Sequence, residues 1–384
     1  MSKRVFITVA EHSADKHAGR FARALRDRLP GVQIDALGGA ELARAGAAVH
    51  HDTVDRAAMG LAAVFRAREV MRLVKLVRAR YTDPATRPDL HVCCDSWSMN
   101  WHFAKLAKEF DVPTLYYIAP QTWASRESRL KKMRRYIDRV ACILPFEQEY
   151  FTRHGLSATF VGHPLFDELP PERATRLETE RHPARPPVIG LLPGSRRSIA
   201  NANVPRLVEV AQAIRTAFPD ARFVIPTTAS THDVVAKWVS AASWIDFARD
   251  QFDAMVPSCD LCVTVSGTAA LHVAALDVPL VVVYHGNPIL WHLVGRWIIK
   301  TRTYSLVNLL SDFHTHIVPE YIPWYGPTKP VSDLVIDLLN HPDKLRAQRK
   351  ALRKMIHTLN HPGASDNVAR MAMEILTTVS AQSP

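Results

Sequence analysis

The chain has 384 residues, of which 47% are hydrophobic and 22% are charged. This composition excludes a disordered protein, and the length suffices for about two domains, each with its own core. Because no run of about 18 uncharged apolar residues occurs, no segment is expected to span a bilayer. The formal net charge of +11 favours contact with phosphates, whether of nucleic acid, anionic lipid or a nucleotide.

The first residues predict a strand rather than a targeting peptide. The stretch MSKRVFITVAEHSAD reaches an acidic residue too early to contain the apolar region of a signal peptide. Cysteines are odd in number and lie in strand-like segments, at positions 93, 94, 142, 259 and 262. They are therefore expected to be reduced thiols of a cytoplasmic protein.

Strands and helices alternate in the first half of the chain, which is typical of a parallel sheet covered by helices. The expected strands are nearly continuous apolar runs, at residues 4–10, 32–39, 89–95, 114–120 and 140–146. The expected helices are at residues 14–29, a short segment from 40, the amphipathic segment 61–80 and a basic segment after Trp123.

The alternation restarts after a polar, proline-rich stretch, residues 178–187, which we interpret as a linker. The strands expected beyond it are at 188–194, 221–227, 244–248, 260–267 and 279–286. The sequence therefore predicts an α/β protein with two doubly wound, Rossmann-like domains that face one another, 1–177 and 188–363. A last helix, within 364–384, is free to pack on either domain, including back on the first.

Small and polar residues stand where three of these strands end. Asp95 ends one strand of the first domain, and PGSRR (193–197) and SGT (266–268) end two strands of the second. In doubly wound sheets the ligand binds beyond the carboxyl ends of the strands. A glycine-containing turn before a helix offers N–H groups and the positive end of the helix dipole to an anion, and Arg196 adds a planar fork suited to phosphate. Together these features predict a phosphate or diphosphate site, although each turn alone could be only a turn and a helix cap.

Other common sites are disfavoured. The chain has no GxGxxG after its first strand and no GxxxxGK[ST], which argues against a nicotinamide reductase and a P-loop hydrolase. Cys259 and Cys262 have CxxC spacing but no second pair, so a buried structural pair is favoured over a zinc or redox site. His314 and His316 are better explained as solvated loop residues. No metal and no other cofactor is predicted.

One long stretch, residues 116–167, contains YYIAPQTWA, a basic helix, LPFE and VGHPLFD in succession. Further segments are PDLHVCCDSWSMNWHFAK, LLPGSR, SGTAALHVAALDVPLVVVYHGNP and SLVNLLSDFHTHIVPEYI. In order and spacing these segments resemble the lipid-A-disaccharide synthase family, glycosyltransferases of the GT-B fold. The resemblance extends from near Val5 to near Ile322.

The resemblance implies transfer of a 2,3-diacylglucosamine from its UDP donor to lipid X, forming a β-1,6-linked disaccharide 1-phosphate in lipid A biosynthesis. Asp95, at the place of the family's essential aspartate, is expected to be the general base; alternatively it only caps the next helix. The residues expected at the donor are Gly194, Ser195, Arg196, Ser266, Gly267, Thr268, His272, Asn308 and Glu320. The residues assigned more generally to the cleft or acceptor are Glu11, Ser13, Asp15, Gln121 and His163.

Two departures from the family pattern fall at this expected site. The first loop reads AEHSAD instead of the family's GEASGD, and Ala10 and Ala14 do not take a positive φ cheaply. His272 stands where the family usually has a glutamate, which in related enzymes holds the nucleotide ribose. Because a neutral imidazole accepts one hydrogen bond and not two, His272→Glu is expected to bind UDP more tightly.

The helix over 61–80 resembles the family's membrane-facing helix. Its apolar side, which could instead pack on the sheet, is formed by Leu61, Val64, Phe65, Val70, Val74 and Val77. With basic residues beside it, this helix predicts peripheral docking on the inner face of the cytoplasmic membrane. A homodimer, a transferase with another nucleotide sugar or lipid acceptor, and a non-catalytic descendant of the fold are open alternatives. No motif supports binding of nucleic acid.

Overall fold

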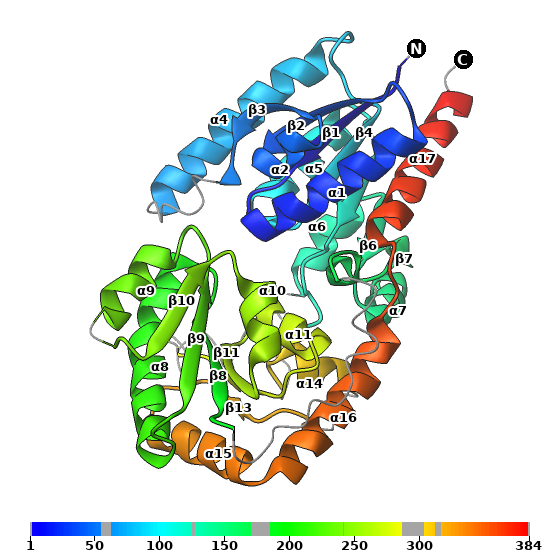
Figure 1. Ribbon diagram of the computed structural model, residues 1–384. Helices are drawn as coiled ribbons and strands as arrows, with labels where there is room; N and C mark the ends of the chain where they lie inside the picture. The colour runs from blue at the N-terminus through cyan, green and yellow to red at the C-terminus, as the bar shows by residue number, and fades with distance from the viewer. Residues whose placement is uncertain are drawn as a thin grey trace. The chain divides into compact units, whose positions relative to one another are not determined.

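The computed structural model describes residues 2–54, 63–124, 127–169, 185–240, 242–285, 303–311 and 316–382. The chain divides into two compact units (Figure 1), Met1–Leu169 with Leu359–Pro384, and Pro170–Thr358. We refer to them as the N-terminal and the C-terminal unit. Most of the expected linker, up to residue 184, lies outside the described residues.

A seven-stranded parallel sheet of order β3-β2-β1-β4-β5-β6-β7 forms the centre of the N-terminal unit. Its strands are β1 (Arg4–Thr8), β2 (Gln33–Gly38), β3 (Ala48–Asp52), β4 (Leu90–Cys94), β5 (Thr114–Tyr117), β6 (Arg139–Cys142) and β7 (Ala158–Phe160). The sequence did not predict β3 and β7. Both are edge strands whose residues alternate between half-buried and exposed, so neither contains a continuous apolar run.

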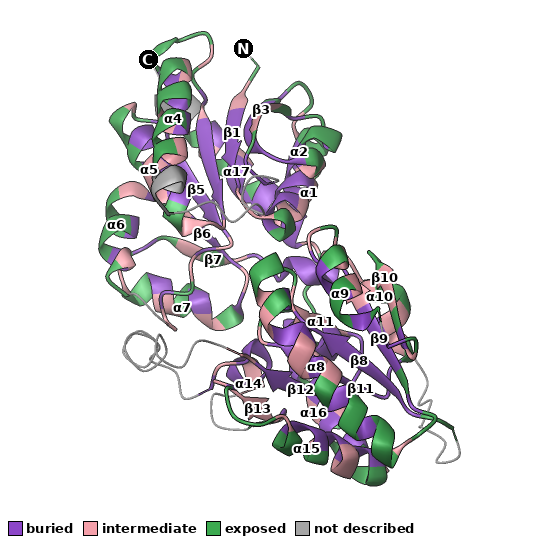
Figure 2. Ribbon diagram, turned by 90° about the vertical axis from the view of Figure 1, so that its left-hand side faces the viewer, coloured by how far each residue is buried: buried purple, intermediate pink, exposed green. Residues whose placement is uncertain are grey.

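Helices cover both faces of this sheet. On one face, α1 (His12–Arg28) and α17 (Ala364–Gln382) pack together over Val5 and Ile7. Along the other face, α4 (Ala63–Thr82), α5 (Trp97–Glu109) and α6 (Arg129–Tyr136) lie in a row (Figure 2). The remaining elements are α2 (Ala40–Arg44), α7 (Pro145–Arg153) and the 3-10 turn η1 (Pro164–Asp167).

The C-terminal end of the chain returns to the N-terminal unit as α17, and Asp167 caps the start of this helix. The Asp167 carboxylate accepts hydrogen bonds from the backbone N–H groups of Gly363 (2.7 Å), Ala364 (3.0 Å) and Ser365 (2.9 Å). A helix start leaves such N–H groups without a partner inside the helix, and a negative charge is favourable at this end of the helix dipole. Asp167, the last residue of VGHPLFD, therefore has a structural role.

The C-terminal unit repeats this design with a six-stranded parallel sheet of order β10-β9-β8-β11-β12-β13. Its strands are β8 (Val188–Leu192), β9 (Arg222–Thr227), β10 (Ile245–Arg249), β11 (Leu261–Val265), β12 (Leu280–Val283) and β13 (Glu320–Tyr321). Its described helices are α8 (Arg197–Ala217), α9 (His232–Val239), α10 (Phe252–Met255), the 3-10 turn η3 (Val256–Ser258), α11 (Thr268–Ala275), α14 (Leu306–Ser311), α15 (Lys329–Asn340) and α16 (Pro342–Leu359).

Both sheets have the strand order of the Rossmann fold, which runs 3-2-1-4-5-6 when each unit's strands are counted from its first. The expected α/β class with two doubly wound sheets is confirmed. The one strand missed in the C-terminal unit, β13, has only two residues and is too short to form an apolar run.

The apolar side of α4 packs into the N-terminal unit, which corrects the expectation that it faces a membrane. Val77 is fully buried, and Val70 and Val74 pack against the same core cluster. Burial in this core removes the apolar area that an amphipathic helix would otherwise expose. Among the described side chains of α4, the exposed large apolar ones are Met71 and Leu76. The other predicted residues, Leu61, Val64 and Phe65, or their side chains, lie outside the described structure.

All five cysteines lie in the described residues and are buried free thiols. Cys259 and Cys262 pack against Gly190 on β8, where an added Cβ would lie 2.5 Å from the Sγ of Cys262. The CxxC spacing therefore serves packing of the sheet. No described helix combines the length and apolar character needed to cross a membrane.

Candidate functional site

The strand order of each sheet reverses at one place, and the predicted residues gather there. In the N-terminal unit the reversal lies between β1 and β4, and in the C-terminal unit between β8 and β11. Open parallel sheets bind ligands beyond the carboxyl ends of the strands at such a reversal. The first loop follows β1, Asp95 follows β4, and the PGSRR and SGT turns follow β8 and β11.

Asp95 has a left-handed backbone conformation directly after β4. Its φ angle is 51°, and that of Ser96 is 43°. Its N–H donates to the carbonyl of Tyr117 (3.0 Å), and its carbonyl accepts from Asn100 Nδ2 (2.7 Å) and the Tyr116 hydroxyl (2.6 Å). Such a conformation costs a non-glycine residue about 1–3 kcal/mol and persists where the surroundings impose it, often at functional sites. The half-buried Asp95 therefore stands at a fixed and strained strand end.

The end of β5 beside it is strained as well. Ile118 has a φ angle of 57°, which is rare for a β-branched residue. The exposed Gln121 follows, in keeping with its assignment to the cleft. Two residues further on, Trp123 Nε1 donates a hydrogen bond to the carboxylate of Glu147 (3.1 Å). Glu147 is buried, and this burial raises its pKa to about 7. This contact joins the PQTWA motif to the LPFE motif.

Only some polar side chains of the first loop, residues 10–15, are exposed to solvent. Glu11 is half-buried at the N-cap of α1, and Ser13 is exposed. Asp15 is 1% exposed, and its carboxylate accepts from the N–H groups of Gly39 (2.8 Å) and Glu41 (2.9 Å) at the start of α2. Burial raises the pKa of Asp15. Asp15 therefore caps α2, and its assignment to the cleft stays a prediction.

The replacement of two family glycines in this loop is accommodated without strain. Ala14 lies inside α1, and neither Ala10 nor Ala14 has a positive φ angle. Glu11, between them, has an extended conformation with φ of −123°. The backbone therefore does not need glycine at either position.

The turn after β8 presents small and basic residues. Gly194 has a φ angle of 100°, and an added Cβ would lie 2.9 Å from the side chain of Ile199, so glycine is required there. Ser195 and Arg196 are exposed, and Arg196 is the N-cap of α8. The Arg197 guanidinium instead lies 2.6 Å and 2.8 Å from the two carboxylate oxygens of Asp233. The fork of Arg197 is thus occupied by a protein carboxylate, while the diphosphate contact of Arg196 stays a prediction.

The turn after β11 is open at Gly267. Its φ angle is 153°, and an added Cβ would meet nothing within 4 Å. Gly267 and Thr268 are exposed at the start of α11. Ser266 is engaged within the protein: its N–H donates to the carbonyl of Val283 (2.9 Å) and its hydroxyl to that of Tyr304 (3.3 Å). The backbone amide of Ser266 is therefore not available to a ligand, which corrects that part of the prediction.

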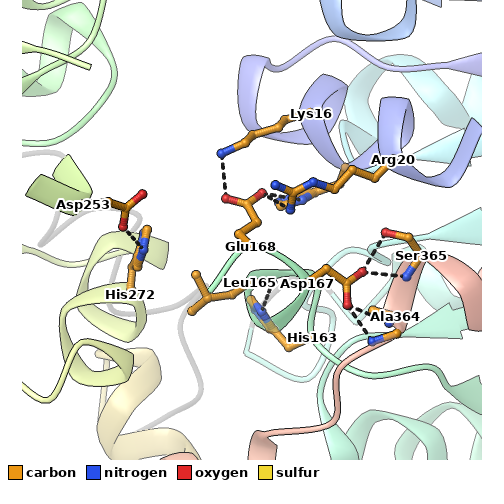
Figure 3. Close-up of polar contacts among 12 residues, drawn as sticks. Lys16, Arg20, His163, Leu165, Asp167, Glu168, Asp253, His272, Ala364 and Ser365 are labelled. Atoms are coloured by element: carbon orange, nitrogen blue, oxygen red, sulfur yellow. Dashed lines mark hydrogen bonds and ion pairs between the residues drawn. The ribbon is translucent and has the colours of Figure 1, made fainter. Parts of the chain in front are cut away.

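His272 on α11 has an acidic neighbour that sequence reasoning missed. Asp253 Oδ1 lies 2.9 Å from His272 Nε2 (Figure 3), and the ring of Phe252 stacks on the imidazole with centroids 4.5 Å apart. His272 is 18% exposed and Asp253 is 59% exposed. The place where the family usually has a glutamate therefore still has a carboxylate beside it. Asp253 lies in no motif, so the sequence carried no signal for it.

Asn308 and Glu320 bind each other and the surrounding backbone. Asn308 is fully buried, and its Nδ2 donates to Glu320 Oε1 (2.6 Å) and to the carbonyl of Val318 (2.8 Å). The carboxylate of Glu320 also accepts from the N–H groups of Tyr304 and Ser305, each at 3.0 Å. These hydrogen bonds support the segment before α14. The donor contact expected of Asn308 and Glu320 stays a prediction.

His163, from VGHPLFD, is buried at the start of η1. It is 5% exposed, and its Nδ1 accepts from the N–H of Leu165 (3.2 Å), which caps η1. The following Glu168 lies 2.7 Å from Lys16 Nζ and 2.7 Å from Arg20 Nη1 on α1 (Figure 3). The ion pairs of Glu168 link the end of η1 to α1. His163 caps η1 through Nδ1, and its assignment to the cleft stays a prediction.

The predicted residues thus fall into two groups. Those exposed or half-buried after a strand end or on the helix that follows it are Glu11, Ser13, Asp95 and Gln121 in the N-terminal unit, and Gly194, Ser195, Arg196, Gly267, Thr268 and His272 in the C-terminal unit, where His272 is also paired with Asp253. Those whose polar groups are engaged within the protein are Asp15, His163, Ser266, Asn308 and Glu320.

Two successive Rossmann-type units make up the GT-B fold, and solved structures with this arrangement are similar to the chain. S. aureus MnaA in complex with UDP has a TM-score of 0.66 at 11% identity, with 100% of this chain and 99% of that chain covered. The glycotransferase of kitacinnamycin has a TM-score of 0.59 at 16% identity, covering 97% of this chain and 99% of that chain. At these identities the likeness shows the fold.

The family follows from sequence. The family model of lipid-A-disaccharide synthetase matches residues 5–375. The lipid-A-disaccharide synthase of Trichlorobacter lovleyi is 30% identical over 385 residues, covering 97% of this chain and 98% of the relative. That of Anaeromyxobacter sp. strain K is 32% identical over 384 residues, covering 98% of each. This chain belongs to the lipid-A-disaccharide synthetase family, and the resemblance found in its motifs is confirmed.

Proposed function

We propose that the chain transfers a 2,3-diacylglucosamine from its UDP donor to lipid X and forms the β-1,6-linked disaccharide 1-phosphate of lipid A biosynthesis. Family membership over residues 5–375 supports this reaction. The observation that carries the assignment of residues is the position of Asp95, whose left-handed backbone lies at the strand-order reversal of the N-terminal sheet.

Asp95 is the proposed general base. The acceptor hydroxyl must lose its proton as its oxygen attacks the anomeric carbon, and a carboxylate at the carboxyl end of β4 can take that proton. The fixed backbone of Asp95 limits the positions that its side chain reaches, which favours a productive geometry. Glu11, Ser13 and Gln121, which follow the neighbouring strands β1 and β5, are proposed to contact the acceptor.

The C-terminal unit is proposed to hold UDP. Negative charge grows on the diphosphate as the glycosidic bond to the donor breaks, and fixed donors stabilise it. The exposed Ser195 and Arg196 at the start of α8, and Gly267 and Thr268 at the start of α11, provide N–H groups and a guanidinium. His272 with Asp253 is proposed to contact the nucleoside.

We propose a peripheral, cytoplasmic location at the membrane, where acylated sugars reside. The exposed Met71 and Leu76 on α4, among the exposed cations Arg68, Arg72 and Lys75, support contact with an anionic lipid surface. On the other side of α5, α6 adds exposed cations along the same face of the sheet: Lys131, Lys132, Arg134 and Arg135.

The reaction is tested with labelled lipid X and the UDP-2,3-diacylglucosamine donor. The purified protein is expected to form the disaccharide 1-phosphate, and Asp95→Asn to lower turnover by about 10²–10⁴-fold with little change in UDP binding. Asp111→Asn is the matched control, because Asp111 is exposed and has a similar φ angle of 55°. Near-full turnover by Asp95→Asn would exclude the base, and no product from the parent protein would exclude the reaction.

A further inference from the structure

A line of buried side chains runs from the end of α4 to the backbone of Asp95. The Tyr81 hydroxyl contacts His91 Nδ1, and His91 Nε2 lies 2.9 Å from the hydroxyl of Thr8. That hydroxyl donates to Asn100 Oδ1 (2.7 Å). Tyr81, His91, Thr8 and Asn100 are each 0% exposed.

The hydrogens in this line have one consistent direction. The single hydroxyl hydrogen of Thr8 is given to Asn100 Oδ1, so Thr8 must accept from His91 Nε2. His91 Nδ1 then accepts from Tyr81. Burial lowers the pKa of His91 to about 3, which keeps the imidazole neutral, as this arrangement requires.

This line of side chains ends at two backbone carbonyls, that of Asp95 and that of the residue before it. Asn100 Nδ2 donates to the carbonyls of Cys94 (3.0 Å) and Asp95 (2.7 Å). Because Nδ2 is surrounded by carbonyl oxygens and Oδ1 faces a donor, the amide has only one favourable orientation. Tyr116, from β5, adds a second hydrogen bond to the Asp95 carbonyl at 2.6 Å.

We propose that Asn100 and Tyr116 are positioning residues that hold the left-handed backbone of Asp95, and that Tyr81, His91 and Thr8 fix the orientation of the Asn100 amide. The role rests on the proposed function of Asp95 as the general base. A buried carbonyl that loses its donors favours a backbone rotation that satisfies it elsewhere. Such a rotation moves the carboxylate away from the acceptor hydroxyl.

The test separates positioning from general stability. Asn100→Ala and Tyr116→Phe are each expected to lower kcat by about 10- to 100-fold while the KM for the UDP donor changes little. Tyr116→Phe removes a single hydroxyl and keeps the ring that packs beside Trp97, so it remains informative if Asn100→Ala fails to fold. Asn367→Ala is the control, because Asn367 Nδ2 also donates to a backbone carbonyl, that of Val161 (2.8 Å), in the same unit.

Each substitution is then repeated in the Asp95→Asn background. If Asn100 and Tyr116 act through Asp95, their loss adds little further effect on kcat there. Parent-like kcat in Tyr116→Phe, or equal effects in both backgrounds, would overturn the proposal even where Asp95→Asn is slow. If Asp95→Asn itself keeps near-full turnover, the failure lies in the proposed base.

Discussion

Asp253 Oδ1 lies 2.9 Å from Nε2 of His272, and the ring of Phe252 stacks on the same imidazole. The histidine is thus held between an acid and an aromatic ring, all within the C-terminal unit. Any group introduced at position 272 will therefore experience the charge of Asp253, and this changes what a glutamate there is expected to do.

The structure revises the expectation for His272→Glu. A glutamate alone would place two carboxylates side by side, and their repulsion opposes the gain from a second acceptor for the ribose hydroxyls. UDP binding is expected to tighten, by about tenfold, only in Asp253→Asn/His272→Glu, since a hydrogen bond to a charged group contributes about 1.5–3 kcal/mol. Calorimetry with UDP measures this difference, with Asp250→Asn as control. Equal Kd values for the double variant and the parent would exclude contact with the nucleoside.

The adjacent arginines of the PGSRR turn form a matched pair. Arg196→Lys keeps the charge but loses the fork, and we expect kcat/KM to fall by about 10- to 100-fold. Arg197→Lys should remain near the parent, because the exposed pair of Arg197 with Asp233 contributes little to stability. Steady-state kinetics and UDP binding of both variants test this. Parent-like behaviour of Arg196→Lys would make Arg196 a structural residue.

Glu147 is expected to make the stability of the protein fall with pH. Burial raises its pKa to about 7 from the ordinary value of 4.5. Below pH 4.5 both states hold the proton; as the pH rises towards 7, the unfolded state loses its proton first. Stability is therefore lost through this window, by up to about 3 kcal/mol, and the loss is complete above pH 7.

Comparison of two variants isolates this contribution. Glu147→Gln should show less loss of unfolding free energy between pH 5 and 7.5 than the parent in chemical denaturation. Glu149→Gln, on the same helix, is the control, because Glu149 is exposed and paired with Arg153. Identical pH dependence in Glu147→Gln and Glu149→Gln would show that Glu147 is ionised throughout.

The sequence predicted the central strands and the strand-end motifs because both are local. Apolar runs mark strands buried on both faces, and Gly194 and Gly267 mark turns that only glycine fits. The direction in which a side chain points depends instead on residues far away in the sequence. Asp15 and His163 lie in motifs beside the site, yet both are buried and cap other elements, because α2 and η1 offer them N–H groups. Contacts between strands, such as that of the Tyr116 hydroxyl with the Asp95 carbonyl, could not be predicted before the order of the strands in the sheet was known.

The membrane surface proposed on α4 differs from the one its apolar periodicity predicted. The periodic valines, such as Val77, are in the core, so the contact must be made by the opposite side of the helix. Among the described side chains, that side exposes Met71, Leu76 and several cations. Each cation near an anionic surface contributes about 1 kcal/mol, so binding should be reversible and sensitive to salt.

Vesicle co-sedimentation tests this surface. The parent is expected to pellet with anionic vesicles at low salt, and to remain in the supernatant with neutral vesicles or at high salt, where the charges are screened. A triple reversal on α4, Arg68→Glu with Arg72→Glu and Lys75→Glu, should abolish pelleting. The same reversal on α16, at the exposed Arg346, Lys350 and Lys354, lowers the net charge equally and should leave pelleting largely intact. Equal loss in both triple variants would mean that net charge alone drives binding, and a parent that never pellets would leave α4 without a membrane role.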